Sequence, residues 1–103
     1  MDSREIDRLE RKFTKEVLWL YILSLLKKKP SHAYVLRKSI EEKFGFLPGN
    51  VTPYVVLYKL QSRNYVKTVR KGNRVVYSIT PSGIRLLSEA SKRLKEKFKL
   101  IFG

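Results

Sequence analysis

Apolar residues recur at spacings of three and four along the first part of the chain, which is the periodicity of one helix face. No Gly or Pro interrupts this pattern from Ser3 to about Lys28, so one long helix is predicted there. Its first half, to Glu16, is mostly charged with a narrow apolar stripe, whereas Val17–Leu26 is apolar nearly all round. We therefore expect the second half to be buried and the first half to project and use its stripe against another surface.

A second helix is predicted between a proline and a glycine. Pro30 ends the first helix, and Ser31 is a good N-cap for a helix that runs to about Phe44. Gly45 supplies the left-handed residue that stops it. The apolar residues expected on its inward face are Tyr34, Val35, Leu36 and Ile40.

A third helix is predicted to begin at Thr52 and Pro53, a cap followed by proline at the first helical position. It covers Tyr54–Arg63, and Asn64 suits the left-handed residue after its end. The residues expected to form its buried stripe are Val56, Leu57 and Leu60. The remaining side chains of this helix are then free to face outward.

The next segment has the pattern of a β-hairpin. Tyr65–Val69 and Arg74–Ile79 are rich in β-branched and aromatic residues, and the loop between them, residues 70–73, contains a Gly-Asn pair. Thr80 and Pro81 then repeat the cap-plus-proline signal, which predicts a last helix over residues 82–102. The residues that recur on one face of this helix are Ile84, Leu87, Ser91, Leu94, Phe98 and Ile101.

The order of these elements predicts the fold. Three helices followed by a two-stranded hairpin is the order of a winged helix-turn-helix, in which the third helix enters the DNA major groove and the hairpin, or wing, reaches flanking phosphates or the minor groove. The expected fold class is mainly α with a small β-hairpin. Extended N- and C-terminal helices are added to the three-helix core and its wing.

The charge of the chain points to a polyanionic partner. Lys and Arg number 23 against 9 Asp and Glu, which gives a formal net charge of +14. Nucleic acid is the first partner that offsets such an excess, and an anionic membrane is the second. A general solubility charge is the alternative, although a surface of mixed sign keeps a protein soluble at much lower net charge.

Catalytic and metal-binding motifs are missing from the sequence. There is no Cys, which excludes disulfides, thiolate zinc sites and cysteine nucleophiles. His32 is the only histidine, and a single histidine with few carboxylates nearby makes no metal site. No Ser/His/Asp arrangement, Gly-rich phosphate loop or HExxH sequence occurs. We therefore expect a protein that is not an enzyme and carries no cofactor.

Membrane and targeting signals are missing as well. Charged residues, rather than an apolar signal core, follow Met1. The longest apolar-rich run, Val17–Leu26, is far below the roughly 20 residues that a membrane-spanning helix needs. We expect no membrane partner and a cytoplasmic, nucleoid-associated protein.

Several segments together resemble the PadR-type transcriptional regulators. Ile22–Leu26 followed by Pro30–Tyr34 is similar to the family's apolar helix, proline and His-Gly-Tyr triplet, and Ile40–Glu42 is similar to the amphipathic helix that comes next. Thr52–Leu60 resembles its recognition helix, and Tyr77–Gly83 resembles its second wing strand and the start of its last helix. The order and spacing of these segments are more specific than any one of them.

The resemblance covers about Val17 to Leu87 and contains departures. Ala33 stands where the family often has Gly, Val55 where it often has Pro, and Asn64 replaces a common Gly. The resemblance implies a DNA-binding transcriptional regulator. It also implies a homodimer held by the last helix, which often packs against the partner's N-terminal helix.

One domain over residues 1–103 is expected, with residues 17–80 as the DNA-binding core and residues 1–16 and 81–103 as dimerisation helices. The apolar residues predicted to form the dimer interface are Ile6, Leu9, Phe13, Leu87, Leu94, Phe98 and Ile101. Coiled-coil-like association or binding to a membrane surface would use the same stripes. Dimerisation explains them without lipid.

The first group of predicted DNA contacts lies on the third helix. Tyr58 and Lys59 face away from its buried stripe and would reach phosphates or base edges, unless this face is only solvated. Thr52 and Tyr54 lie at the helix start, where hydroxyls and backbone N–H groups bind phosphate well. Thr52 also suits a purely structural cap, and Tyr54 a half-buried position.

The second group lies beside the third helix and in the wing. Arg63 and Lys67 are expected to flank the groove, with a loose surface role as the alternative. A hairpin tip needs a turn but does not need positive charge, so Lys71 or Arg74 is expected to insert along a minor groove. The residues predicted to contact DNA from the wing are Arg70, Lys71, Asn73 and Arg74.

Two further residues have more than one interpretation. His32 is either a helix-start residue near phosphate or a partly buried packing residue. Trp19 is either a core residue or the platform on which a flat aromatic effector stacks at a dimer interface. Nothing else in the sequence supports a small-molecule effector.

The predicted function is sequence-specific DNA binding by a transcriptional regulator, a repressor that acts as a homodimer. Two recognition helices related by a two-fold axis would enter successive major grooves about 34 Å apart on a palindromic operator. One alternative is a nonspecific architectural protein of the chromatin type, which the excess charge favours. The other is a protein-interaction module with a basic surface.

Overall fold

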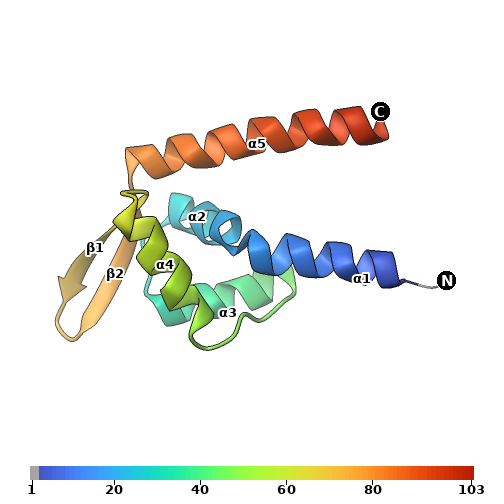
Figure 1. The fold of residues 1–103 in the computed structure, drawn as a ribbon. Coiled ribbons are helices and arrows are strands. Elements are labelled where there is room, and N and C mark those ends of the chain that lie inside the picture. Colours follow the sequence, from blue (N-terminus) through green and yellow to red (C-terminus); the bar gives the residue numbers. More distant parts are fainter. Residues whose placement is uncertain (1–2) are drawn as a thin grey trace.

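A computed structural model describes residues 3–103 and has a helical body with a hairpin at one end and two helices that project from the other (Figure 1). The body contains α2, α3 and α4, the hairpin is β1 and β2, and the projecting parts are α1 with η1, a π-helical segment, and α5. In chain order the elements are α1 (Arg4–Arg11), η1 (Lys12–Glu16), α2 (Leu18–Lys28), α3 (Ala33–Phe44), α4 (Thr52–Ser62), β1 (Val66–Lys71), β2 (Arg74–Ile79) and α5 (Pro81–Phe102).

The hydrophobic core lies between α2, α3, α4 and β1. Helix α2 is central to it, which confirms the prediction that the apolar half of the first helical segment is buried. The amphipathic periodicity of α3 and α4 directs their apolar faces to the same interior. The buried core residues are Leu18, Ile22, Leu23, Leu26, Ala33, Leu36, Ile40, Leu57, Leu60 and Val66.

The prediction of one continuous helix from residue 3 to residue 28 is wrong. Helix α1 passes into the π-helical η1, and the helix breaks at Val17, whose φ of −111° and ψ of 24° are not helical. The Thr14 hydroxyl donates to the Glu10 carbonyl oxygen at 2.9 Å, and the Tyr21 hydroxyl donates to the Phe13 carbonyl oxygen at 2.9 Å. Side-chain donors thus occupy carbonyls of the widened turn, which compensates for the lost regular helix bonds.

The start of α3 differs from the prediction. Ser31 is not the N-cap, because its backbone pairs with Tyr77 through N···O distances of 3.0 and 2.8 Å and is therefore held in an extended bridge. His32 takes the cap position, and the helix begins at Ala33. Tyr34 was predicted to face inward and is instead exposed, because the buried face of this helix consists of Ala33, Leu36 and Ile40. Gly45 ends the helix in the left-handed conformation, as predicted.

Helix α4 begins one residue earlier than predicted. Thr52 is its first residue rather than its N-cap; Val51 is at the cap, and Pro53 is buried in the first turn. The predicted stripe is confirmed, with Leu57 and Leu60 buried and Val56 packed partly against the core. Asn64, at φ 64°, supplies the predicted left-handed residue after the helix.

The predicted hairpin is confirmed, with a longer first strand. β1 and β2 are antiparallel from the Val66–Ile79 pair to the Lys71–Arg74 pair. Arg70 and Lys71, expected in the loop, are therefore strand residues, and the turn consists of Gly72 and Asn73 alone. Gly72 adopts φ +62°, which suits a two-residue hairpin turn.

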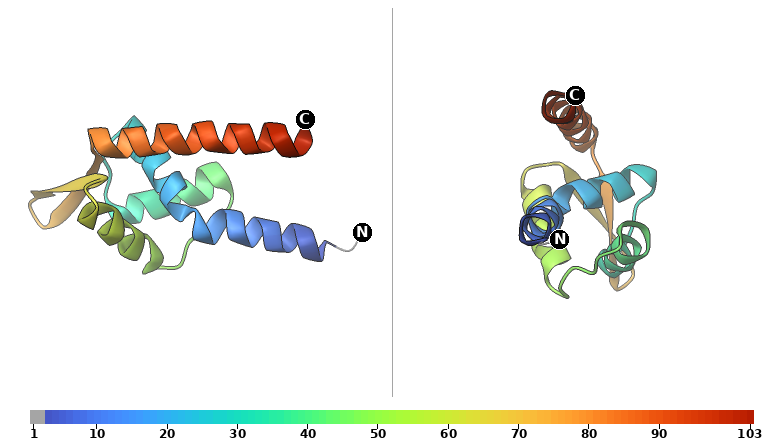
Figure 2. Two further views of the ribbon diagram at one scale, coloured as in Figure 1. Left: turned by 45° about the horizontal axis from the view of Figure 1, so that its top comes forward. Right: turned by 90° about the vertical axis from the view of Figure 1, so that its right-hand side faces the viewer.

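The base of α5 is fixed to the body by the predicted cap. The Thr80 hydroxyl accepts from the Gly83 backbone N–H at 3.0 Å and donates to the Asn64 carbonyl oxygen at 2.7 Å. Beyond its base α5 leaves the body, and its end and the start of α1 lie at the same end of the molecule (Figure 2). The described residues span 51 × 27 × 21 Å, and none of their helices meets the length and apolarity that crossing a membrane requires.

Candidate nucleic-acid interface

The outward side of α4 is exposed along its whole length. Its inner side packs through Pro53, Leu57 and Leu60, so the residues about half a turn away point to solvent. Tyr54 and Tyr58 are on this outer side, and Tyr58 is 71% exposed. Every residue predicted to contact DNA is exposed: Thr52, Tyr54, Tyr58, Lys59, Arg63, Lys67, Arg70, Lys71, Asn73 and Arg74.

The charges that α4 and the wing themselves carry are all positive. No Asp or Glu occurs between Glu42 and Glu89, although this stretch contains α4 and both strands. Among residues 3–103 the ion pairs within 4 Å are Lys12–Glu16 and Arg93–Glu89, both on the projecting helices. The cations of α4 and the wing thus form none of the ion pairs found among the described residues, and their excess over acids creates a positive potential at this end of the molecule.

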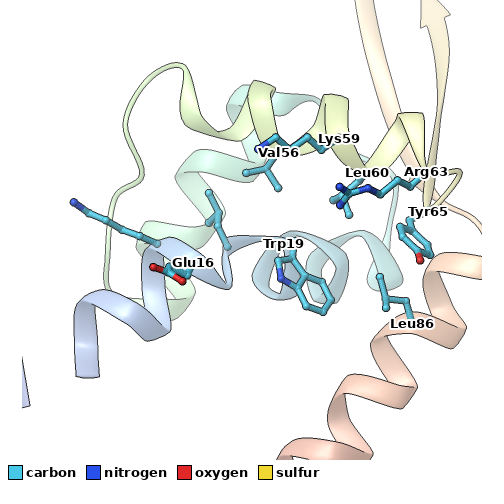
Figure 3. Close-up of a pocket in the computed structure, with 10 residues that line it drawn as sticks. Glu16, Trp19, Val56, Lys59, Leu60, Arg63, Tyr65 and Leu86 are labelled. Atoms are coloured by element: carbon cyan, nitrogen blue, oxygen red, sulfur yellow. The ribbon is translucent and has the colours of Figure 1, made fainter. Parts of the chain in front are cut away.

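One flank of α4 faces η1 and α2 across a hollow of about 780 Å³. Figure 3 shows Lys59 and Arg63 on the α4 side of this hollow and the Trp19 indole on the α2 side. The remaining lining residues are Lys15, Glu16, Leu18, Val56, Leu60, Tyr65 and Leu86. Lys59 and Arg63 therefore lie on a different flank from Tyr54. Trp19 both packs partly against the core and lines the hollow.

The other flank of α4 meets the wing and the first turn of α3. Arg74 donates from Nη1 to the Tyr34 hydroxyl at 3.2 Å and lies 5.9 Å from the centre of the Tyr34 ring. The His32 ring stacks on Tyr34 at 5.8 Å, and its Nδ1 is 3.1 Å from the Val75 carbonyl oxygen. These contacts fix the wing against α3, and Tyr54 lines the same shallow recess.

Burial at this flank affects one further tyrosine. Tyr77 on β2 lines the same recess as Tyr54. Burial, and secondly the proximity of Tyr54, raise the pKa of Tyr77 above its ordinary value. The Tyr77 hydroxyl is therefore neutral at physiological pH, and it adds no negative charge to the surface.

Sequence analysis missed three exposed residues of this surface. Tyr34 was assigned to the core, while Val51 and Val55 were assigned no role, although both are exposed beside Tyr58. A helical projection of residues 51–58 would have placed both valines on the outer side. The acid-free stretch between Glu42 and Glu89 was a second available signal for the location of the basic surface.

The residues predicted to form a dimer interface are brought together only in part. Phe13, Leu87, Leu94 and Phe98 line one apolar groove of about 350 Å³ between η1, α2 and α5. Ile6 and Leu9 on α1 and Ile101 on α5 lie outside this groove and are more exposed. This arrangement leaves a long apolar strip open on the projecting helices.

The exposed groups of α4 and the wing include many hydrogen-bond donors and cations. Within residues 3–103, no three His, Cys, Asp or Glu side chains come close enough together to hold a metal ion. The exposed hydroxyls, amide and cations of α4 and the wing are donors suited to phosphate oxygens and base edges. Their arrangement on a helix and an adjacent hairpin matches the way in which a winged helix approaches DNA.

Comparison with solved structures places the fold among regulators. A candidate transcriptional regulator from Thermoplasma acidophilum is 33% identical, with a TM-score of 0.73 over 87% of this chain and 90% of that chain. A transcriptional regulator from Clostridium thermocellum is 28% identical, with a TM-score of 0.74 over 80% of this chain and 86% of that chain. A PadR family transcription regulator from Clostridium difficile is 25% identical, with a TM-score of 0.71 over 82% and 96%.

Two comparisons used the sequence alone, one with curated proteins and one with models of protein families. No curated protein matches the chain at a significant level. The model of the transcriptional regulator PadR-like family matches residues 22–89, which include α3, α4, both strands and the base of α5. The chain therefore belongs to the PadR-like family of transcriptional regulators.

Proposed function

We propose that this regulator is a sequence-specific DNA-binding repressor that acts as a homodimer and has no catalytic activity. The observation that carries the proposal is the exposed, acid-free surface of α4 and the wing. Winged-helix geometry directs α4 into a major groove and the hairpin to the flanking backbone or minor groove. A protein with this role acts at the nucleoid in the cytoplasm.

The proposal includes two kinds of DNA contact, to base edges and to phosphates. Tyr54, Tyr58 and Lys59 approach base edges, whereas Thr52 at the helix start contacts a phosphate. Phosphate contacts fix the position of the protein and supply sequence-independent affinity. The residues that contact the backbone or the minor groove from beside α4 and from the wing are Arg63, Lys67, Arg70, Lys71, Asn73 and Arg74.

The dimer completes the proposed binding unit. Residues 17–80 form the DNA-binding core, and residues 1–16 and 81–103 form the dimerisation helices; residues 1 and 2 lie outside the described part. The apolar groove at Phe13, Leu94 and Phe98 supports this assignment, because it leaves apolar surface for a second copy to cover. A two-fold dimer presents two α4 helices about 34 Å apart to a palindromic operator.

A second candidate function is nonspecific, architectural DNA binding. The net charge of +14 on 103 residues favours it, because phosphate contacts alone supply affinity for any duplex. The two functions share the surface of α4 and the wing. They differ in whether affinity depends on base sequence.

Selection of duplexes from a random pool, followed by competition binding at a fixed salt concentration, separates these functions. We expect the selected palindrome to bind at least about a thousandfold more tightly than a scrambled duplex. A plot of log affinity against log salt should have a slope near −9, since a dimer makes about ten phosphate contacts. Transcription in vitro from a promoter that contains the selected site shows whether the protein represses or activates. We expect repression.

Other outcomes identify the rival functions. Equal affinity for selected and scrambled duplexes, with the same steep salt dependence, would establish the architectural role. Absence of salt-dependent duplex binding would leave a protein-interaction module. An effector that stacks on Trp19 stays a prediction; because Trp19 is the only tryptophan, its fluorescence reports directly on any compound that enters the hollow beside α4.

A further inference from the structure

The outer side of α4 contains an apolar stripe that the body of the protein does not cover. Val51, Tyr54, Val55 and Tyr58 are 67%, 51%, 46% and 71% exposed. Their spacing of three, four and seven residues places them on one helix face. Val51 directly precedes α4, and because its φ of −92° and ψ of −25° are helical, it extends this face toward the N-terminus. An exposed apolar group of this kind on a highly charged protein indicates an interaction surface.

The charge around the stripe selects its partner. Lys59 and Arg63 lie on one side of α4, and Arg74 on the wing lies near the other side, beside Tyr54. No carboxylate occurs anywhere between Glu42 and Glu89. An apolar stripe between unneutralised cations suits a polyanion that itself has apolar groups, and it disfavours a second copy of this same basic surface.

The outer side of α4 has few side chains that read bases by paired hydrogen bonds. Gln61 is turned toward the wing, where its amide lies 3.4 Å from the Thr68 hydroxyl, and Lys59 lies on the flank that faces Trp19. Discrimination along the centre of the helix then depends on apolar contact and on tyrosine hydroxyls. In the major groove the C5-methyl of thymine is the apolar group that a base pair presents.

We infer that the stripe of Val51, Tyr54, Val55 and Tyr58 reads thymine through its C5-methyl groups. This inference rests on the proposed function, and it adds the chemical class of base that the operator presents to α4. Each half-site contains thymines where the two valines approach the groove. The tyrosine rings cover the neighbouring methyl or sugar surface, and their hydroxyls stay in contact with water or phosphate.

The test removes the methyl groups without changing base pairing or charge. In the selected duplex, each thymine of a half-site is replaced in turn by uracil, and wild-type protein is titrated against each duplex. We expect at least one half-site position at which the Kd rises about fourfold per methyl lost, the value for burial of one such group. Replacing the symmetric pair should raise the Kd about sixteenfold, and replacements outside the half-sites should leave it unchanged.

A protein variant with a matched control assigns the effect to α4. Val55→Ala removes two methyl groups from the stripe, so the Kd ratio between uracil and thymine duplexes should fall toward one at the sensitive position. Val69→Ala is the control, because Val69 is a valine of equal exposure, 47%, on β1 of the wing. We expect this control to keep the full wild-type ratio.

Four results would overturn the inference. If the protein prefers its selected site but no uracil replacement changes the Kd, the inference fails while the proposed function stands. If Val69→Ala abolishes the uracil effect and Val55→Ala does not, the methyl contact belongs to the wing. If Val55→Ala changes the solution mass of the free protein, the stripe is a protein contact. Absence of duplex binding by the wild type removes the proposed function as well.

Discussion

The outer side of α4 and the far half of α5, residues 91–102, both expose large apolar side chains, but the chemistry of those side chains differs. On α4 and its N-cap residue, two of the four exposed apolar residues are tyrosines, which have a polar hydroxyl at the ring edge. On α5 the exposed residues are pure hydrocarbons: Phe98, Leu100, Ile101 and Phe102. Tyrosine suits a surface that stays partly wet in its complex, whereas hydrocarbon side chains favour one that becomes dry.

The two regions also differ in how their charges are used. α5 contains the Arg93–Glu89 ion pair, and Glu96 lies among its lysines. α4 and both strands contain no acid at all. Interspersed signs are typical of a helix whose polar side is only solvated, and a single sign is typical of a surface that meets phosphate. Exposed apolar area therefore indicates contact with DNA at α4 and contact with a second protein copy at the far half of α5.

The largest effect is expected from breaking the apolar strip of α5. Phe98→Glu introduces a charge into the groove lined by Phe13 and Leu94, so the proposed dimer should dissociate. Loss of the second DNA-binding core should weaken operator affinity by about 10²- to 10⁴-fold, because the two half-sites are no longer bound as one unit. Sedimentation equilibrium measures the mass, and anisotropy titration measures the affinity.

The control for this variant changes the net charge by the same amount. Lys92→Ala removes one positive charge per chain, whereas Phe98→Glu adds one negative charge, so both lower the net charge by one. Lys92 lies about 120–160° around α5 from Leu94 and Phe98. We expect it to remain a dimer. A wild-type protein of monomer mass, or a dimer that survives Phe98→Glu, would remove the assignment of α5 to dimerisation.

The next effect concerns the base of α5. A Cβ at Gly83 would overlap the Tyr65 carbonyl oxygen and lie 2.7 Å from Ile79 Cγ1, so backbone must move to accept Gly83→Ala. We expect the free energy of unfolding to fall by about 1–3 kcal/mol, the usual cost of overpacking. Alanine is the better helix former by about 1 kcal/mol, so any net loss shows that the clash dominates.

The same substitution at the other end of this helix is the control. Gly103→Ala meets the Lys99 carbonyl oxygen at 3.3 Å, an exposed contact that can relax. Urea denaturation should place Gly103→Ala within about 0.5 kcal/mol of the wild type. Equal stability of both variants would mean that the base of α5 is no more tightly held than its tip.

The elements that sequence predicted correctly depend on local signals. Gly45, Asn64 and Thr80 each fix a helix end through their own backbone or hydroxyl, and the Gly72–Asn73 pair forms the hairpin turn. Such signals act within a few residues, so they can be recognised without knowing the rest of the fold. The order of helices, hairpin and helix followed from them.

The errors arose where distant parts of the chain decide the conformation. Ser31 failed as a cap because Tyr77, far along the chain, holds it in a bridge. Tyr34 lies off the buried face of α3, and its exposed ring contacts Arg74 of the wing and His32, which helical periodicity cannot reveal. The break at Val17 lies in a segment without Gly or Pro, where the hydroxyls of Thr14 and Tyr21 bond to main-chain carbonyls, so no local signal predicts it.

The exposure of the predicted site residues could be read from the sequence, but not the full set of residues on this surface or their surroundings. Sequence assigned Lys59 and Tyr54 to one DNA-facing helix, and both are exposed there. Helix periodicity separates them by about 140°. That one flank faces Trp19 and the other faces the wing depends on how α2 and the hairpin lie around α4. Whether these residues touch DNA stays a prediction.

A smaller effect separates the cations of the two regions. Lys71→Ala in the wing should weaken binding to every duplex alike and make the salt slope of the dimer shallower by about 1.8, two phosphate contacts at 0.9 each. Lys59→Ala on α4 should instead reduce the preference for the selected site. Lys97→Ala on the far half of α5 is the control, and we expect its slope to match the wild type. If the salt slope changes equally for the Lys71 and Lys97 variants, the positive charge of the whole protein, rather than its position in the wing, determines DNA affinity.

The smallest effect tests the junction between the projecting helix and the body. The Tyr21 hydroxyl donates to the Phe13 carbonyl oxygen of η1, and its ring packs edge-on against Phe44 and Phe46. Burial, with a secondary contribution from Glu10, raises the pKa of Tyr21 above 10.0 in the folded protein. As pH rises through 10, the Tyr21 hydroxyl loses its proton in the unfolded chain before it does so in the folded protein. The contribution of neutral Tyr21 to folding stability is therefore complete below pH 10 and is lost above it.

Tyr21→Phe removes both the hydrogen bond and this titration. We expect a loss of about 0.5 kcal/mol at pH 8, the low end for an exposed hydrogen bond, and a shallower decline of stability above pH 10 than in the wild type. Tyr77, whose pKa burial also raises, keeps part of the decline in both proteins. Thermal denaturation at pH 8 and pH 10.5 measures the difference. A decline as steep as in the wild type would mean that Tyr21 ionises alike in the folded and unfolded chains, and that the junction exposes its hydroxyl to water.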